Sequence, residues 1–264
     1  MDTVMKGLVG ALAAIAPVAA RLQRSRCAST AVGFDRAEMD SEAKMEFKPY
    51  GLHIMVGSGA PSTWPSNWDT TDTGKAFVAA AKGVKSDVKV KVTACDAPVG
   101  HVFVFPASVR YEFQSNPTST DATRILRVHA SKEANEGTLL PKCSPVGPMI
   151  FVCSHAARDA RCGACGPVLV NTFREEIASL RLAADVFACS HIGGHKYAGN
   201  AIIFAARDRQ SRGDWFGYVK PDRVRTILRY TLEGESDLKS DPVIQGTWRG
   251  CVDCEDIEDL ARST

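Results

Sequence analysis

The sequence predicts an α/β protein with one large domain or two small ones. Its 264 residues fit either arrangement at roughly 100–200 residues per domain. The content of 45% hydrophobic and 23% charged residues is typical of a globular chain and excludes a disordered, collagen-like or coiled-coil protein. Short apolar runs of strand length alternate with segments of helix length, and this alternation predicts the α/β class.

The first 47 residues are predicted to be a presequence and a disordered linker. Residues 3–34 contain no Asp or Glu and are rich in Ala, Arg and Ser, which is the composition of a mitochondrial or plastid transit peptide. A secretory signal peptide, with Lys6 before an apolar stretch, is the alternative interpretation. We expect import into mitochondria, with plastids as the second possibility.

Charge and hydropathy exclude two classes of partner. Basic residues exceed acidic residues by two, and the first 34 residues hold four basic residues and one acidic residue. The rest of the chain is close to neutral, whereas a nucleic-acid-binding domain is strongly basic. The longest nearly apolar run covers residues 7–20 and contains Pro17, while a membrane-spanning helix needs roughly 20 residues. We therefore expect neither nucleic-acid binding nor a membrane span.

The first structured unit is predicted over residues 48–143. An apolar run at 52–56 and the alternation of Val with Lys at 88–92 are typical of strands. The predicted strands cover residues 52–56, 88–94, 101–105 and 109–113, and the predicted helices cover 74–82 and 124–130. This unit contains no set of metal ligands, so we expect an architectural or partner-binding role for it.

The second unit is predicted over residues 148–232, and residues 233–264 form a C-terminal extension. A helix over 167–182 would start at Pro167, where proline is tolerated, and would bury one apolar face. The predicted strands cover residues 149–153, 184–189, 201–205 and 215–219, and a closing helix covers 221–230. The order β-α-β-β-β-α is that of a thioredoxin-like domain, and the fold predicted for the chain is two thioredoxin-like domains.

Two loops of the second unit concentrate sulfur and nitrogen ligands. The loop over 153–167 and the loop over 189–200 each follow a predicted parallel strand, and the carboxyl ends of such strands meet at one edge of the sheet. Gly193 and Gly194 disfavour a helix and leave backbone N–H groups free to point at an anion or an inorganic sulfide. The side chains expected to converge are those of Cys153, Cys162, His191 and His195.

Together, the two loops resemble the paired signatures of the sucrase/ferredoxin-like family. Similar residues also occur at 64–66, 102–106, 215–218 and 248–250, so the resemblance covers roughly residues 50–250. It implies that the second domain is a thioredoxin-like ferredoxin with one [2Fe–2S] cluster. The ligands that the resemblance implies are Cys153, Cys162, His191 and His195, where related all-cysteine ferredoxins would have cysteines at the last two positions.

The resemblance implies one-electron transfer by a carrier rather than catalysis by an enzyme. No nucleophile, general base or further cofactor motif is evident, and the carboxylate pair that glycoside hydrolysis needs does not stand out. Two imidazoles in place of two thiolates leave the cluster less negative. We therefore expect a reduction potential well above that of a plant ferredoxin and dependent on pH. The expected partners are an unidentified redox donor and acceptor.

Two alternatives remain open at the level of the sequence. One is a thiol–disulfide redox protein that uses the Cys162/Cys165 pair, which precedes a predicted helix, or the Cys251/Cys254 pair. The other is a structural subunit that holds zinc, because two cysteines and two histidines are also a common zinc set. If Cys162 is a metal ligand, Cys165 is expected to be a packed thiol.

Overall fold

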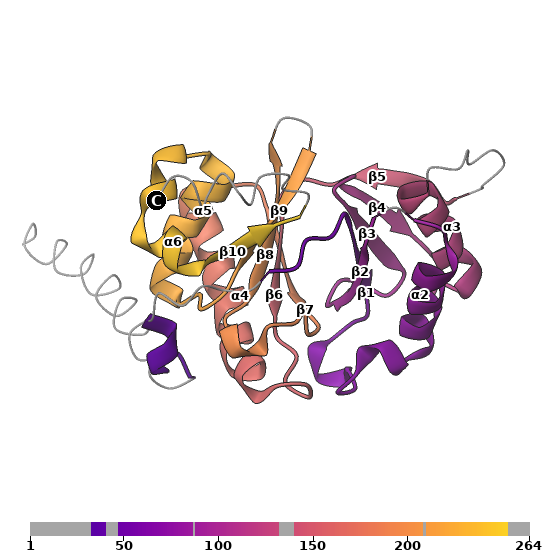
Figure 1. Ribbon diagram of the computed structural model, residues 1–264, viewed down its shortest axis with the longest axis horizontal. Helices are drawn as coiled ribbons and strands as arrows, with labels where there is room; N and C mark the ends of the chain where they lie inside the picture. Colours follow the sequence, from indigo (N-terminus) through magenta and orange to yellow (C-terminus); the bar gives the residue numbers. More distant parts are fainter. Residues whose placement is uncertain (1–32, 41–46, 87, 132–139, 208–209, 253–264) are drawn as a thin grey trace, which may run out of the picture.

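The computed structural model of the chain describes residues 33–40, 47–86, 88–131, 140–207 and 210–252 (Figure 1). The presequence predicted for the N-terminus lies mostly outside these residues. No helix among the described residues is long and apolar enough to cross a membrane.

The described strands form one mixed sheet of ten strands, in the order β10-β9-β8-β6-β7-β2-β1-β3-β4-β5. The pairs β1–β2 and β6–β7 are parallel, and the other neighbours are antiparallel. The strands are β1 (Leu52–Gly57), β2 (Val90–Cys95), β3 (His101–Phe105), β4 (Val109–Glu112), β5 (Cys143–Pro145), β6 (Met149–Cys153), β7 (Asp185–Cys189), β8 (Ala201–Arg207), β9 (Gln210–Phe216) and β10 (Trp248–Cys251). The α/β class predicted from the sequence is confirmed.

Two halves of the chain repeat one order of elements. The first half runs β1-α2-β2-β3-β4-α3 and the second runs β6-α4-β7-β8-β9-α5. In each half the first two strands are parallel, and the third strand pairs with the first in the antiparallel sense. The helices are α2 (Asp72–Gly83), α3 (Ser119–Ala130), α4 (Ala160–Leu180), α5 (Val224–Leu228) and α6 (Pro242–Thr247).

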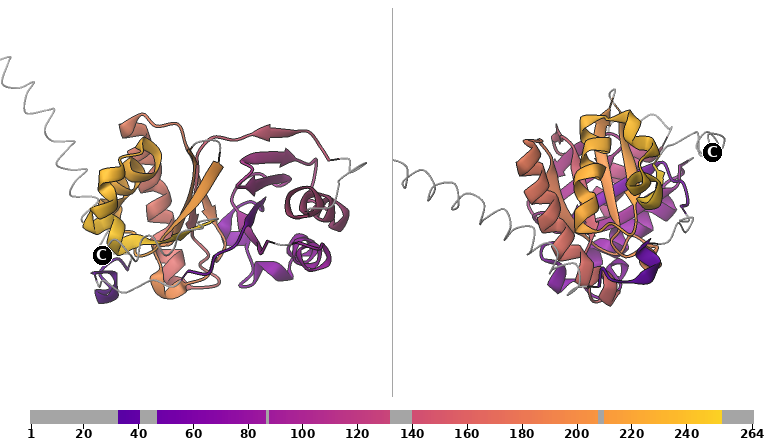
Figure 2. Two further views of the ribbon diagram at one scale, coloured as in Figure 1. Left: turned by 45° about the horizontal axis from the view of Figure 1, so that its top comes forward. Right: turned by 90° about the vertical axis from the view of Figure 1, so that its left-hand side faces the viewer.

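The two halves pack against each other through the sheet faces that their helices leave uncovered. Helices α2 and α3 lie outside the first half and α4, α5 and α6 lie outside the second, with the strands between them (Figures 1 and 2). A buried core of residues from both halves fills the centre. Within it, the rings of Phe105 and Phe204 stack at a centroid distance of 3.8 Å. The halves are also continuous through the sheet, where Cys95 of β2 pairs with Cys189 of β7.

Helix α4 begins earlier than the sequence predicts. The prediction placed its first residue at Pro167, but the helix starts at Ala160, and the proline lies inside it. The reason is a cap further upstream, where the side chain of Asp159 accepts a hydrogen bond of 2.9 Å from the backbone N–H of Arg161. Cys162 therefore lies in the first helical turn rather than in a loop.

Segments at both ends of the described chain pack onto the second half. Phe34 and Met39 are buried in the core that lies beneath α4 and α5, and the guanidinium of Arg36 donates a hydrogen bond of 2.6 Å to the carbonyl of Ala198. Packed structure thus precedes Tyr50, near which the sequence predicts that it begins. In the predicted C-terminal extension, α6 packs on α5 and β10 adds an edge strand beside β9.

Candidate metal centre

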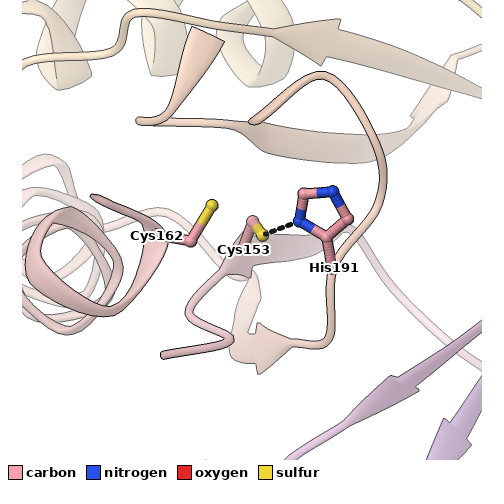
Figure 3. A group of neighbouring side chains, drawn as sticks. All are labelled: Cys153, Cys162 and His191. Carbon is pink, nitrogen blue, oxygen red and sulfur yellow. Dashed lines mark hydrogen bonds between the residues drawn. The ribbon is translucent and has the colours of Figure 1, made fainter. Parts of the chain in front are cut away.

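Three of the four predicted ligands come together at the carboxyl ends of β6 and β7. The ligand atoms of Cys153, Cys162 and His191 all lie within 4.8 Å of one another (Figure 3). Nδ1 of His191 points at Sγ of Cys153 from 4.0 Å. Both cysteines are buried, and His191 is half-buried. The group therefore has a buried sulfur side and a nitrogen side that reaches toward the surface.

Regular backbone structure holds each of the three side chains. Cys153 is the last residue of β6, and its N–H donates a hydrogen bond of 2.9 Å to the carbonyl of Asn200. Cys162 lies in the first turn of α4, where the positive end of the helix dipole favours a thiolate. His191 follows β7 by two residues. Parallel pairing of β6 and β7 in register, Cys153 opposite Cys189, brings these ends together.

The two cysteines of the group act on each other's ionisation. A hydrogen bond from Cys162 lowers the pKa of the Cys153 thiol well below its usual value, with a further lowering by His191, against the effect of burial. The same hydrogen bond raises the pKa of Cys162, and burial raises it further. The pair therefore gives up one proton readily and retains the second, as expected of two neighbouring thiols that share a hydrogen bond.

His155 holds the loop that carries His191. Its Nδ1 accepts a hydrogen bond of 3.1 Å from the backbone N–H of His191. Nε2 consequently carries the ring proton and donates a hydrogen bond of 2.8 Å to the carbonyl of Pro65 in the first half. The neighbouring Trp64 meets the imidazole edge-on, with ring centroids 5.7 Å apart. Residues 64–65, noted in the sequence for their resemblance, thus support the site from the other half.

His195, the fourth predicted ligand, lies outside the group of three. It begins the short 3-10 helix η4 (His195–Tyr197) and is exposed. Its ring centroid is 5.7 Å from that of His191, and the two planes are inclined by 32°. The intervening Gly193 and Gly194 both have positive φ, of 91° and 65°, which favours glycine. The two imidazoles are therefore neighbours on one loop.

Asn200 and Arg249 secure this histidine loop, and neither was singled out from the sequence as a site residue. The buried Asn200 side chain donates a hydrogen bond of 3.0 Å to the carbonyl of Gly194. Its Oδ1 accepts a hydrogen bond of 2.6 Å from Nη1 of Arg249. The guanidinium lies so close to Gly194 that a Cβ there would come within 2.5 Å of Nη2. The sequence signal for both residues was weak, since each only forms part of a stretch that shares the family resemblance.

The other cysteines that the structure describes do not belong to the group of three. Cys165 is buried, its Sγ lies 3.8 Å from the carbonyl of Gly33, and burial raises its pKa. Cys189 and Cys95 are buried between the halves, and burial raises the pKa of each, that of Cys95 to about 12. Cys251 is disulfide-bonded, and Cys254 lies outside the described residues.

Fold and site together define the class: a mixed α/β protein with a cysteine–histidine group, suited to a metal, at the carboxyl ends of paired strands. The chain belongs to the sucrase/ferredoxin-like family, whose model matches residues 44–250.

Fungal proteins named altered inheritance of mitochondria protein 32 are similar to part of the chain. The one from Debaryomyces hansenii is 42% identical over 91 residues, which cover 34% of this chain and 33% of the relative. The one from Clavispora lusitaniae is 40% identical over 119 residues, 45% of this chain and 39% of the relative. The matches thus span only a third to two fifths of these relatives. No solved structure matches the chain significantly.

Proposed function

We propose that the chain is an electron carrier that binds one [2Fe–2S] cluster through Cys153, Cys162, His191 and His195. The observation that carries the proposal is the convergence of two buried cysteines and one histidine from three separate elements. When bound, the cluster would supply reversible one-electron chemistry. Membership of a ferredoxin-like family supports iron–sulfur binding over other uses of this set.

The spacing of the donor atoms suits a metal centre. The ligand atoms of Cys153, Cys162 and His191 all lie within 4.8 Å of one another, and Sγ of Cys153 lies 4.0 Å from Nδ1 of His191. Donor atoms this close can reach a common centre, either one metal ion or one [2Fe–2S] cluster. His195 is on the loop of His191, and the glycines between them allow its ring to approach as a fourth ligand.

The chain's residues would give the centre a dry side and a wet side. The buried cysteines keep water from the sulfur side, while the exposed His195 brings the nitrogen side to the surface. Electron exchange with a partner protein would therefore occur on the histidine side. Imidazole ligands leave the site less negative than thiolates would, which raises the reduction potential, and their outer nitrogens can bind or release a proton.

We further propose the domain assignment and the setting of the protein. Each half, residues 48–143 and 148–232, is assigned as a thioredoxin-like domain on the order and pairing of its strands. Residues 1–47 are assigned as presequence and linker, although residues 33–40 pack on the second half. The names of the fungal relatives support an association with mitochondria rather than plastids, and the ferredoxin-like family supports a redox role. The donor and acceptor proteins are the partners still to be identified.

Metal and sulfide analysis of the full chain, purified without oxygen, tests this function. We expect two irons and two acid-labile sulfides per chain and a coloured, reducible spectrum. His191→Cys and His195→Cys should keep the cluster and lower its potential, because each adds a negative ligand. His101→Cys, a change at a histidine of β3 outside the group, should leave the potential unchanged. One zinc with no sulfide would instead make the chain a structural subunit and refute electron transfer.

The thiol–disulfide alternative gains little from the geometry. Cys162 and Cys165 are both fully buried in α4 and their pKa values are raised, whereas an attacking cysteine must be an accessible thiolate. Redox activity that survives in a Cys165→Ser/Cys254→Ser double variant would argue against this alternative.

A further inference from the structure

A cavity of about 230 Å³ opens beside the histidine loop, and none of the three potential ligands Cys153, Cys162 and His191 lines it. Gly193 and Gly194 form part of its wall. Its other walls combine basic and aromatic side chains, among them Lys48, Lys91, Lys196, Arg249, Tyr50 and Trp215. We call this cavity the cationic pocket.

The charge of the cationic pocket is strongly one-sided. Four of its lining side chains are cationic, and no carboxylate lines it among the residues that the structure describes. Lys91 makes no hydrogen bond and no ion pair within the described chain, and its ammonium lies 5.2 Å from the ring centroid of Trp215. On the same ring, the guanidinium of Arg249 lies 5.5 Å from the centroid. Two cations thus share one aromatic ring.

The position of Lys91 is costly, because its ammonium is partly buried and has no hydrogen-bond or ion-pair partner among the residues that the structure describes. Burial lowers the pKa of Lys91 to about 8, and the charge of Arg249 lowers it further in the same direction. Like charges in a poorly solvated site repel, and a bound negative group removes this cost. The side chain nevertheless remains largely protonated at neutral pH, so the pocket keeps its positive field.

The walls of the cationic pocket are built to hold their shape. The indole N–H of Trp215 donates a hydrogen bond of 2.9 Å to the hydroxyl of Tyr50. That hydroxyl is 2.8 Å from Nδ1 of the buried His53. Asn200 fixes Arg249, whose guanidinium lies 4.7 Å from the ring centroid of Tyr197. These contacts hold the aromatic side chains and the guanidinium of Arg249 in place.

We propose that the cationic pocket binds a small organic anion with two or more negatively charged oxygens, such as a dicarboxylate, a tricarboxylate or a phosphate ester. The four basic side chains that line the pocket give it a positive potential that attracts an anion, and its aromatic walls suit the carbon body of an organic ligand. The volume lies below the ~300–1,000 Å³ of drug-sized pockets, which limits the ligand to the size of a small metabolite. Binding itself does not depend on a metal, but its effect on the histidine side rests on the proposed function.

Binding would act on the histidine loop through shared residues. Arg249 touches both the pocket and Gly194, and Lys196 follows His195 directly. A negative charge held there would make the electrostatic potential at the histidine side more negative and would disfavour the uptake of an electron by a bound cluster. Binding of the anion would therefore lower the reduction potential of a cluster held at the histidine side.

Calorimetric titration of the full chain with citrate and with inorganic phosphate, at constant ionic strength, tests the proposal. We expect saturable binding of at least one of them, weakened at least tenfold by Lys91→Gln. The matched control is Lys89→Gln, which removes the same charge from an exposed neighbour outside the pocket and should leave the affinity unchanged. Stronger binding of citrate would identify carboxylates as the ligand class, and stronger binding of phosphate would identify phosphate esters.

Two results would overturn the proposal: no saturable binding of either anion, or equal weakening by Lys91→Gln and Lys89→Gln, which indicates diffuse attraction only. Thermal denaturation of each variant without ligand verifies that it folds. Iron and sulfide are measured on the same samples. Saturable anion binding by a chain that lacks iron would support the cationic pocket and refute the proposed function. Iron and sulfide in a chain that shows no saturable anion binding would refute the pocket and support the proposed function.

Discussion

At the scale of residues, the site depends on side chains outside the group of three potential ligands. Asn200 donates a hydrogen bond to the carbonyl of Gly194, the guanidinium of Arg249 lies beside the same glycine, and His155 accepts a hydrogen bond from the N–H of His191. Each of these contacts fixes the backbone between or beside the two histidines. The position of the imidazoles is therefore set by the loop, and residues that support metal ligands commonly affect affinity as strongly as ligands do.

Replacement of Asn200 by alanine tests this dependence. The change removes the hydrogen bonds that the Asn200 side chain makes to the carbonyl of Gly194 and to the guanidinium of Arg249, which should cost about 1–3 kcal/mol of unfolding free energy. It should also speed the loss of metal to a chelator, because the histidine loop is released. Urea denaturation and the rate of metal loss measure the two effects.

Asn116→Ala is the matched control for this change, because Asn116 is exposed, and surface substitutions usually stay within about 0.5 kcal/mol. If both asparagine variants behaved alike, the role of Asn200 in holding the loop would be refuted.

Local sequence indicates which ligands could meet, but it does not indicate what holds them. Cys153 and His191 follow strands that run parallel, and the edge at which such strands end can be inferred from the order of elements. The bond between Asn200 and Arg249 joins residues 49 positions apart in sequence. It depends on an antiparallel edge strand, β10, in a region that reads as a polar extension. No local pattern encodes such a contact.

At the scale of elements, the close approach of α4 to β6 positions Cys162 against Cys153. The helix can come this near because Gly166 faces the end of the strand, where a Cβ would lie 2.5 Å from the carbonyl of Cys153 and 2.6 Å from the Cα of Ser154. Real Cβ atoms essentially never approach so closely. The glycine is thus a condition for the two sulfurs to share one site.

Gly166→Ala should therefore force α4 away from β6. We expect a loss of about 1–3 kcal/mol in unfolding free energy from overpacking, together with reduced metal content, because the two cysteines separate. Gly83→Ala is the control, since the space around the last residue of α2 is open, and alanine there should be neutral or slightly stabilising. Metal analysis and denaturation of both variants decide the point. An unchanged metal content in Gly166→Ala would contradict this account.

The helix boundary shows why sequence patterns locate elements better than their ends. Apolar spacing after Pro167 correctly indicates a helix, but proline at a first helical position and proline inside a helix give the same local signal. The cap at Asp159 decides between them, and an isolated aspartate is also common in loops. The error matters for function, because it moves Cys162 from a flexible setting to a helix N-terminus.

At the scale of the whole molecule, the two halves form one structure rather than two linked units. Their sheets continue into each other at Cys95 and Cys189, and aromatic rings from both halves interlock in the central core. Within each half the order of elements could be predicted, because it follows from local patterns. The packing of the two halves against each other could not be predicted. A strand covered by helices and a strand covered by another sheet are both rich in apolar residues, so composition does not distinguish them.

The buried His53 sits in this central core and predicts how the stability of the molecule depends on pH. Its ring stacks on Trp215 of the other half, with a centroid distance of 6.4 Å. Burial, with a smaller contribution from the charge of Lys91, lowers its pKa well below 6.5. Below pH 6.5 the unfolded chain binds a proton at this residue and the folded chain does not. Stability should therefore fall as the pH drops from 7.5 to 5.5.

Each unit by which the pKa of His53 in the folded chain lies below 6.5 allows a loss of about 1.4 kcal/mol in unfolding free energy on acidification. Burial also lowers the pKa values of His101, His129 and His155, so the wild-type slope reports several sites. His53→Gln isolates one of them, because glutamine stays neutral throughout this range. The variant should be less stable at pH 7.5, having lost packing, yet lose less stability on acidification than the wild type. Urea denaturation at pH 7.5, 6.5 and 5.5 measures both slopes, and parallel slopes would show that His53 is not held neutral in the core.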